Sequence, residues 1–242
     1  MAGVMQLRRI LHALFLAGLV SLCAHRAQAG SIEVSPVSTD LEPGQQAAVV
    51  TVINRDAEPT AVQVRAFVWT QDSRRDSLAP TQDLLVSPPV FQLAPGASQV
   101  VRLVLRRPSA EPERAFRLLV DEIPSPAREG QQVRFALRLS LPVFAHAVPS
   151  GRADLHWRVL QNGELAVDNR GTRRAQLAGL TVTGPGGARL PLLEPENPYV
   201  LPGVERRWRF KGSPPRPGTT LRASGTGEAG QFAVDVPVTA NP

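Results

Sequence analysis

The histidines and paired carboxylates of this sequence do not have the spacing that catalysis or metal binding needs. After residue 25 the histidines are His146 and His156, and neither has a carboxylate at the helical spacing that places two metal ligands on one face. Asp121 and Glu122 are adjacent, and neighbours in a strand point to opposite faces, so they cannot share a proton. The pattern predicts neither an acid–base pair nor a metal site, and an enzyme is the less favoured class.

A glycine-rich run near the C-terminus has the spacing of a nucleotide-binding loop. The sequence GTGEAG places Gly225, Gly227 and Gly230 at G-x-G-x-x-G spacing. A dinucleotide site needs that run between a strand and a helix, because the pyrophosphate binds at the helix N-terminus. Here the run leads into QFAVDVPV, whose alternation predicts a strand. We interpret it as a hairpin loop and expect no cofactor.

The first 29 residues have the features of a secretory signal peptide. A basic start precedes an apolar run over residues 10–24, and residues 27–29 form an A-x-A cleavage site. We therefore expect secretion, cleavage after Ala29 and a mature chain that begins at Gly30. No second long apolar run follows, so no membrane insertion is expected after cleavage.

Removal of this leader changes the composition of the chain. The one cysteine, Cys23, lies in the leader, so the mature chain can form no disulfide within itself. The leader also carries three of the 27 basic residues, which leaves a net charge of 24 − 21 = +3. Nucleic-acid-binding proteins usually carry a stripe or cluster of basic charge, so nucleic acid is not an expected partner.

Short strands separated by turns dominate the rest of the sequence. TAVQVRAFVWTQ, at residues 60–71, alternates cleanly, and the other runs of this kind are bounded by proline or glycine. Turn residues within 145–154 mark a boundary, after which Asn162-Gly163 predicts a hairpin. We expect an all-β protein with two β-sandwich domains, at residues 30–148 and 149–242.

One strand differs from the others in length and regularity. VRFALRLSLPVFA has a large apolar residue at every second position, six of them over about 33 Å: Val133, Phe135, Leu137, Leu139, Leu141 and Val143. An ordinary strand of this kind lines its own core. This one precedes the domain boundary, where a sandwich often has an edge, and edge strands normally carry charges or kinks that prevent pairing. The strand over residues 132–145 is therefore a candidate surface for pairing with another chain.

A set of longer motifs accompanies this strand. The first half contains PVSTDLEPGQQAAVVTVIN, LLVSPPVFQLAPGASQVVRLV and FRLLVDEIP. The second half contains NGELAVDNRG followed by AQLAGLTV, and YVLPG followed by RRWRF. With these motifs the whole mature chain resembles the periplasmic pilus-assembly chaperones of chaperone–usher pathways, the PapD-like family. Its second half is similar to the branch tied to archaic or spore-coat-like fimbriae.

The resemblance implies both a fold and a function. The fold is two immunoglobulin-like β-sandwiches in an L or boomerang arrangement. The function is that of a periplasmic chaperone that lends strand 132–145 to a fimbrial (pilin) subunit lacking one strand, by β-augmentation. The subunit then passes to an outer-membrane usher. The exposed edge strand also offers a route to self-association, and no cofactor is implied.

Two positions depart from the best-known family members, which anchor the subunit's C-terminal carboxylate with an arginine and a lysine. The matching residues here are Ser38 and Pro142, which cannot pair with a carboxylate. Arg102 and Arg117 are candidates for a displaced anchor, because a guanidinium can bind a carboxylate through two parallel hydrogen bonds.

The family's ion pair between the two domains is also altered. Glu122 matches the acidic partner, whereas His146 stands where an arginine is usual. The resemblance implies a contact between Glu122 and His146, and such a contact would respond to pH near neutrality.

Two rival classes stay open at this point. A secreted structural or adhesive module, or a fimbrial component, would use the same sandwiches. A subunit should begin with a donor extension, however, and here the strand pattern starts within a few residues of Gly30. A carbohydrate-binding module or hydrolase would need a group of acidic or aromatic residues, and we interpret Trp69, Trp157 and Trp208 as core residues.

Overall fold

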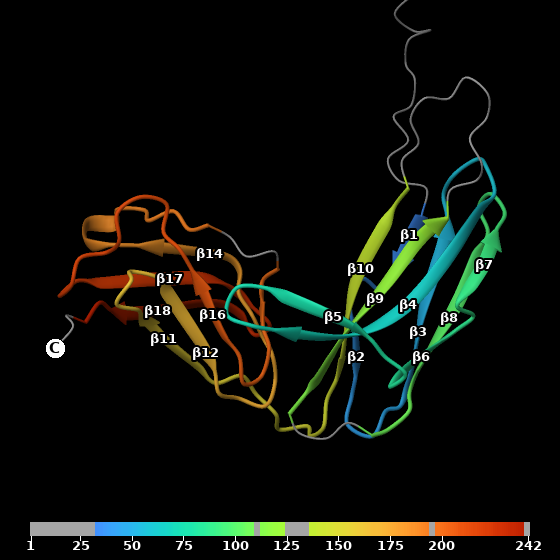
Figure 1. Cartoon of the computed structure of the whole chain (residues 1–242), viewed down its shortest axis with the longest axis horizontal. Coiled ribbons are helices and arrows are strands. Elements are labelled where there is room, and N and C mark those ends of the chain that lie inside the picture. Colours follow the sequence, from blue (N-terminus) through green and yellow to red (C-terminus); the bar gives the residue numbers. More distant parts are fainter. Residues whose placement is uncertain (1–31, 109–111, 124–135, 194–196, 240–242) are drawn as a thin grey trace, which may run out of the picture. The chain divides into compact units, whose positions relative to one another are not determined.

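The structure is a computed structural model that describes residues 32–108, 112–123, 136–193 and 197–239. From Ile32 onward the chain forms one compact unit. Within the described ranges the regular structure is almost entirely β-strand, with one short 3-10 helix, η1, at Pro185–Gly187 (Figure 1). No helix in these ranges has the length and apolar character needed to cross a membrane.

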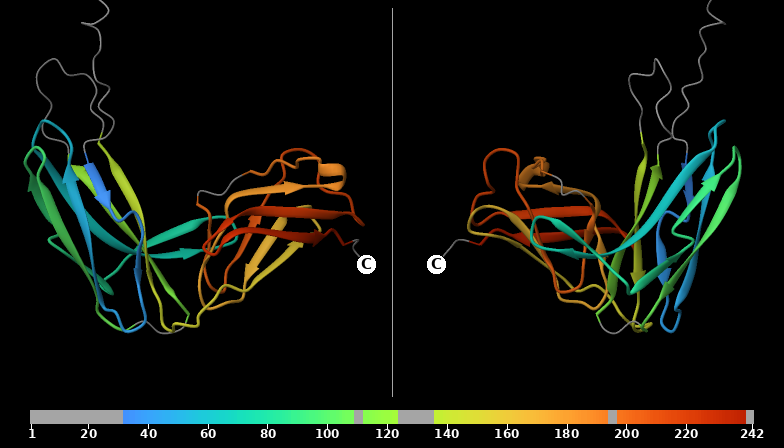
Figure 2. Two further views of the ribbon diagram at one scale, coloured as in Figure 1. Left: turned by 180° about the vertical axis from the view of Figure 1, so that it is seen from behind. Right: turned by 45° about the vertical axis from the view of Figure 1, so that its right-hand side comes forward.

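The first ten strands build a sandwich of two sheets (Figures 1 and 2). One sheet has the order β1-β3-β8-β6, and the other has the order β2-β10-β9-β4-β5 with β7 also paired to β4. The strands are β1 Ile32–Ser35, β2 Thr39–Leu41, β3 Ala47–Asn54, β4 Thr60–Gln71, β5 Asp76–Pro80, β6 Leu84–Ser87, β7 Val90–Leu93, β8 Ser98–Leu105, β9 Arg114–Ile123 and β10 Arg138–Ala145.

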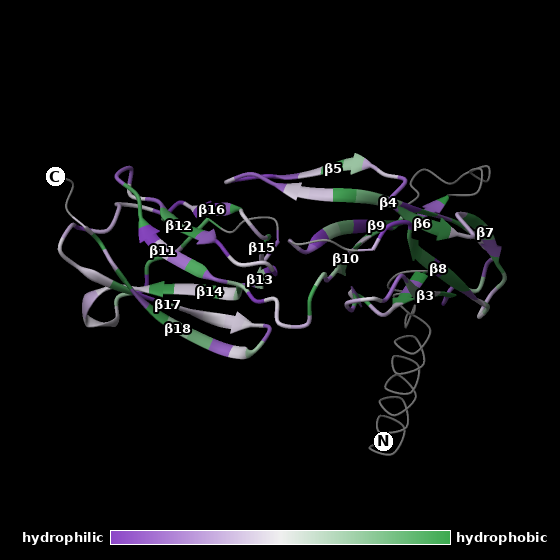
Figure 3. Cartoon of the chain, turned by 90° about the horizontal axis from the view of Figure 1, so that it is seen from below, coloured by the Kyte–Doolittle hydropathy of each residue, from purple (hydrophilic) through white to green (hydrophobic). Residues whose placement is uncertain are grey.

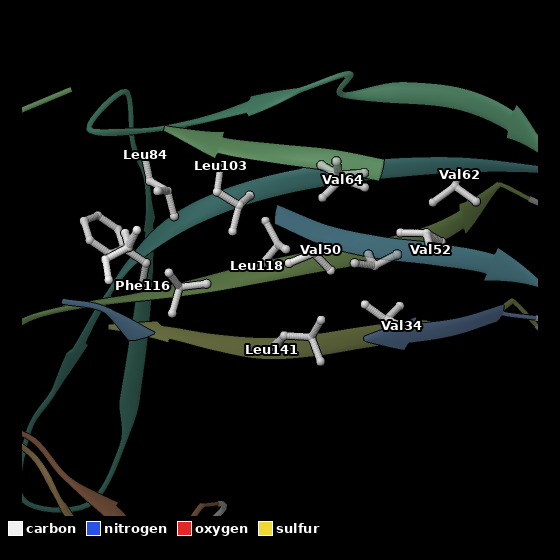
Figure 4. Packing of buried hydrophobic residues seen from close by; sticks show 14 of the residues in the cluster. Val34, Val50, Val52, Val62, Val64, Leu84, Leu103, Phe116, Leu118 and Leu141 are labelled. Atoms are coloured by element: carbon white, nitrogen blue, oxygen red, sulfur yellow. The ribbon is translucent and has the colours of Figure 1, made fainter. Parts of the chain in front are cut away.

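Side chains at alternate positions of facing strands form the core of this sandwich. Val50 and Val52 of β3 and Phe116 and Leu118 of β9 lie in it, and each is at most 1% exposed (Figure 4). Successive residues of a strand point to opposite faces, so the apolar alternation decides which face of each strand turns inward. Burial of each such side chain stabilises the fold by roughly 1.5–3 kcal/mol, which fixes the register of the strands.

The remaining strands build a second group of sheets with its own core. The strand orders are β11-β12-β16, β14-β17-β18 and β13-β15, all antiparallel. Figure 3 shows apolar and polar bands alternating along β11. The strands are β11 Leu155–Val159, β12 Leu165–Asn169, β13 Ala175–Gln176, β14 Ala178–Thr183, β15 Tyr199–Val200, β16 Glu205–Trp208, β17 Thr220–Gly227 and β18 Gly230–Pro237.

Two predicted turns are present in the second sandwich. Gly163 has a φ of +78° in the turn between β11 and β12, a backbone region that favours glycine. The GTGEAG run joins β17 to β18, and Gly227 pairs with Gly230 across the hairpin. The hairpin interpretation of that run is therefore confirmed, because a strand follows it and not a helix.

The predicted all-β architecture of two β-sandwiches is confirmed. Trp157 and Trp208 belong to the core of the second sandwich, whereas Trp69 lies in a separate cluster with Phe144 and Leu201. The last strand of the first sandwich ends at Ala145 and the first strand of the second begins at Leu155.

Candidate functional site

The long apolar strand of the sequence corresponds to β10, whose side chains fall into two groups. Leu141 and Val143 are buried in the core of the first sandwich, at 9% and 0% exposure. Leu137 and Leu139 are half-buried at the margin of that core. Val133 and Phe135 lie outside the described residues. The C-terminal half of the strand, from Leu141 on, thus belongs to this chain's own core, whereas Leu137 and Leu139 in the preceding part are only partly enclosed.

The backbone of β10 is paired along its whole length on one side only. It runs antiparallel to β9 from Arg138 to Ala145. On its other side β2 pairs with residues 143–145 alone, in parallel. Among the described residues, no strand covers Arg138 to Pro142 on that side. This stretch is a free edge, and free backbone groups at a sheet edge are a template for pairing with another chain.

The opposite sheet also ends at a single-paired strand. β1 pairs with β3 and stands first in its sheet, and after Ser35 the chain crosses to the other sheet, where Thr39–Leu41 forms β2. Within the described residues β1 and β6 are therefore the two edge strands of the β1-β3-β8-β6 sheet (Figure 1).

Charged side chains flank the free edge on the outer face of the sheet. Arg138 of β10 bonds to Asp121, and Arg65 of β4 binds the other carboxylate oxygen at 2.6 Å. Burial opposes ionisation of Asp121, but the bonds to the two arginines outweigh it and lower the pKa of this carboxyl. Arg138 is a charge of the kind that discourages indiscriminate pairing at an edge.

Glu122 holds the beginning of this strand. Its backbone N–H donates to the carbonyl of Leu137 at 2.9 Å, and its side chain accepts from the Leu137 N–H at 3.3 Å. The Thr60 hydroxyl donates to the other oxygen of the carboxylate at 3.3 Å. Glu122 thus fixes the backbone of Leu137, the first of the two half-buried leucines.

The expected contact between Glu122 and His146 is wrong. In the β9–β10 ladder Asp121 pairs with Arg138, whereas Arg114 pairs with Ala145, so Glu122 and His146 lie near opposite ends of the strand pair. His146 instead contacts Asp40, which precedes it by 106 residues, and Glu113. The antiparallel register separates the two residues that the family resemblance brought together.

His146 is the centre of a buried cluster of charges. Its Nε2 lies 2.7 Å from Asp40 Oδ1, and its Nδ1 lies 2.6 Å from Glu113 Oε2. Burial alone would lower the pKa of His146, yet the hydrogen bonds to Asp40 and Glu113 outweigh burial and raise the pKa to about 9. The ring is therefore a cation at neutral pH, with both nitrogens donating to carboxylates.

Two arginines of the second sandwich complete this cluster. Arg174 lies 2.9 Å from Asp40, 3.1 Å from Glu113 and 2.8 Å from Glu228. Its guanidinium also stacks on the Phe144 ring, 3.6 Å from the centroid. Arg173 Nε lies 3.0 Å from His146 Nδ1, and its like charge lowers the pKa of His146, an effect that the two carboxylates outweigh. The end of β10, β2 and the second sandwich are thus joined by a cluster of cationic side chains and carboxylates.

The two candidate anchor arginines lie on different sheets. Arg102 is exposed on β8, where it pairs with Val49 and Ser87. Arg117 is half-buried on β9 opposite Pro142 of β10. Ser38 directly precedes Thr39, the β2 partner of Val143. The structure therefore brings Arg117, Pro142 and Ser38 into one region and places Arg102 elsewhere.

The surroundings of Arg117 keep its guanidinium fixed. It lies over the Trp69 ring, 3.8 Å from the centroid, which is the geometry of a cation–π contact. Burial lowers the pKa of Arg117, but an arginine in a protein stays protonated. Among the described residues no carboxylate lies within ion-pair distance of it.

Sequence reasoning missed the second buried face of β10. Phe144, which points away from the first core, is 0% exposed and packs with Trp69 and Tyr199 at centroid distances of 5.9 and 5.4 Å. The signal was available in LPVFA, where an unbroken apolar run replaces the alternation, as expected for a strand buried on both faces. The described residues contain no group of three or more His, Cys, Asp or Glu that could hold a metal ion.

The comparison with protein families decides the class of this chain. The profile of the pili and flagellar-assembly chaperone, PapD N-terminal domain, matches residues 31–151, which is half of the chain. The chain belongs to the PapD-like family of pilus chaperones. Members of this family are periplasmic chaperones and not enzymes.

Solved structures of pilus chaperones share the fold. A chain of the CsuC–CsuE chaperone–tip adhesion subunit complex from archaic Csu pili of Acinetobacter baumannii is 23% identical, with a TM-score of 0.65, over 87% of this chain and 100% of that one. The E. coli chaperone DraB is 20% identical, with a TM-score of 0.62, over 85% and 96%.

A third match comes from a chaperone–pilin complex. A chain of the Salmonella enterica SafA pilin–SafB chaperone complex is 19% identical, with a TM-score of 0.63, over 86% of this chain and 97% of that one. No curated protein matches the sequence. These likenesses establish the fold of a PapD-like chaperone for both halves of the chain.

Proposed function

We propose that this PapD-like chaperone captures fimbrial subunits by lending them strand 132–145 and delivers them to an outer-membrane usher. The observation that carries the proposal is the free edge of β10 over Arg138 to Pro142, beside the half-buried Leu137 and Leu139. A subunit strand paired there gains main-chain hydrogen bonds, and the alternate leucines enter its groove.

The surface lent to the subunit is the part of the strand that precedes Leu141. Leu141 and Val143 already fill this chain's own core, so they anchor the donor strand and add little to binding. Leu137 and Leu139, with Val133 and Phe135 before them, supply the apolar side chains for the subunit. Complete burial of such a side chain contributes roughly 1.5–3 kcal/mol, and a half-buried leucine contributes part of that. Association costs several kcal/mol, so main-chain pairing is needed as well.

Arg117 is the proposed anchor for the subunit's C-terminal carboxylate. It lies opposite Pro142, in the region where Ser38 and Pro142 cannot supply a cation. Its guanidinium is held on Trp69 and has no carboxylate partner among the described residues. Arg102 lies on the other sheet of the sandwich and is the weaker candidate.

The remaining parts of the proposal follow the family. Residues 1–29 form a signal peptide that is cleaved after Ala29 as the chain enters the periplasm. The domains are residues 30–148 and 149–242, with the boundary in the connection between β10 and β11. The second half is assigned to the archaic or spore-coat-like branch. In the absence of subunit, two copies can associate through the free edge of β10.

A single substitution tests the lent strand. Leu137→Arg should leave the protein folded, because Leu137 is half-buried at the margin of the core. It should abolish co-purification of a co-expressed fimbrial subunit from the periplasm. Val100→Arg is the matched control, because Val100 is 53% exposed on β8, outside the sheet of β10. If Leu137→Arg is unfolded by circular dichroism while Val100→Arg is folded, Leu137 serves the chain's own core and the proposal fails.

A further inference from the structure

The hairpin of β4 and β5 extends beyond the sheet that carries it. β9 pairs with β4 from Ala61 to Val68, whereas β5 pairs with the last five residues of β4, Phe67–Gln71. Beyond Val68 the hairpin therefore lacks the neighbour that supports β4 elsewhere. We call residues 71–76 at its end the tip.

The tip holds its own shape through an aspartate. Asp72 Oδ1 accepts hydrogen bonds from the backbone N–H groups of Arg74 and Arg75, at 2.7 and 2.8 Å. The Asp72 N–H donates to the Arg75 carbonyl at 3.0 Å. These bonds from backbone N–H groups lower the pKa of Asp72. The turn is thus locally ordered before any contact with the rest of the chain is counted.

Backbone groups of the second sandwich bind this tip. The Arg207 N–H of β16 donates to the Ser73 carbonyl at 2.9 Å. The Gln71 amide is used at both ends: it donates to the Tyr199 carbonyl at 3.1 Å and accepts from the Leu201 N–H at 2.9 Å. Because one amide bonds to both a backbone acceptor and a backbone donor, Gln71 fixes the position of the tip against residues 199–201.

Asp76 supplies the counter-charge of a buried arginine. Arg206 of β16 is 1% exposed, and its Nη1 lies 3.2 Å from Asp76 Oδ1. Asn197 donates to the other oxygen of the carboxylate. Within the described residues Asp76 is the one carboxylate in ion-pair distance of Arg206, and Arg206 Nη2 is buried without a hydrogen-bond partner. Removal of one partner of a buried ion pair is strongly destabilising.

Arg74 supplies the counter-charge of a buried glutamate. The Glu164 side chain, just before β12, is 6% exposed, and Arg74 Nη2 lies 2.7 and 3.0 Å from its two oxygens. Asn162 adds a hydrogen bond to this carboxylate, but in the described part of the chain its cationic partner is Arg74. The second sandwich thus buries two opposite charges, and both are neutralised from the first sandwich.

We propose that the tip of the β4–β5 hairpin is a docking arm that neutralises the buried charges Arg206 and Glu164, so that β12 and β16 reach full stability only against the first sandwich. An unpaired buried charge raises the free energy of the folded state, so loss of the arm must loosen the strands that carry these charges. The inference is independent of subunit capture, because it concerns the chain alone.

Hydrogen–deuterium exchange of the full-length protein, followed by mass spectrometry, tests the arm. Asp76→Asn should accelerate exchange at least tenfold in peptides that contain β12 and β16 and leave the core peptides of β3 and β9 unchanged. Arg222→Gln is the control, because the Arg222–Asp235 pair is exposed and lies within the second sandwich. If Asp76→Asn does not accumulate as folded protein, Arg74→Gln gives the same test at Glu164.

A compensating variant separates charge from packing. Asp76→Asn with Arg206→Met removes both charges of the pair, so neither partner is left as an uncompensated buried charge. This double variant should regain most of the protection that Asp76→Asn loses. The proposal is overturned if the single variant exchanges within twofold of wild type in β12 and β16, or if both sandwiches lose protection equally.

Discussion

His146 and Glu113 form an ion pair of 2.6 Å in which each side chain is only 1% exposed. The same imidazole binds Asp40 of β2 at 2.7 Å, and Arg173 and Arg174 approach the group from the second sandwich. The end of β10 is thus fixed to β2 by a charged ring. β2 pairs with β10 over residues 143–145, and His146 is the next residue of the chain. The contact between His146 and Asp40 therefore lies at the point where the chain leaves the first sandwich.

Stability should fall as pH rises through the weakly alkaline range. The pKa of His146 is raised from 6.5 to about 9 in the folded chain by its bonds to Asp40 and Glu113. Protonation of His146 therefore stabilises the folded state. This stabilisation is fully present below about pH 6.5 and is lost as the pH rises from 6.5 to 9. The loss is roughly 2–3 kcal/mol of unfolding free energy. Urea unfolding at a series of pH values measures it.

His146→Gln is the control for that titration. It removes the proton that binds in this range, so its unfolding free energy should be lower than that of wild type at pH 6 and nearly constant up to pH 9. His156 is exposed in contact with Asp154, and His156→Gln should keep the wild-type slope. A wild-type profile that is flat from pH 6.5 to 9 would contradict the assignment of a charged His146.

The division of β10 into a core half and an edge half predicts different costs of truncation. Leu141→Ala should lower the unfolding free energy by about 2–5 kcal/mol, because it leaves a cavity in the first core. Leu137→Ala should cost much less, since its side chain is half-buried at the margin. Chemical denaturation of the two variants measures the difference. Equal costs would mean that both leucines serve the chain's own core alike.

Arg117 and Arg102 make a matched pair of substitutions. Arg117→Gln should reduce the amount of co-expressed subunit that co-purifies by about tenfold, because a charge-assisted bidentate contact is lost. Arg102→Gln should leave it unchanged, since Arg102 is exposed on the other sheet. Thermal unfolding of the free Arg102→Gln variant should stay close to wild type, and Arg117→Gln should lose only its contact with Trp69, roughly 0.5–2 kcal/mol. A loss of capture with Arg102→Gln alone would move the anchor to β8.

The strands and their inward faces could be predicted because they depend on local alternation. Val62 and Val64 of β4 are buried as their spacing indicates, and the glycine run before Gln231 closes a hairpin because a strand pattern follows it. The same rule identified β10, but it treated the strand as uniform. The change at LPVFA, where Phe144 turns to a second apolar cluster, was visible as a break in the alternation.

The ion pairs could not be predicted, since their partners are far apart in sequence. Asp40 precedes His146 by 106 residues, and Asp76 precedes Arg206 by 130. Nothing near His146 in the sequence indicates which carboxylates it meets, and the register of β9 against β10 excludes Glu122. The docking arm was likewise hidden, because QDSRRD has the composition of an ordinary polar loop.

Amide exchange of β10 tests the lent strand most directly. Hydrogen–deuterium exchange of peptides spanning residues 136–142 is compared in the free protein and in its complex with a co-expressed fimbrial subunit. We predict that protection of these amides rises on binding, while peptides of β8 stay unchanged. If the same amides exchange equally slowly in the free protein and in the complex, this strand is not the one that pairs with the subunit.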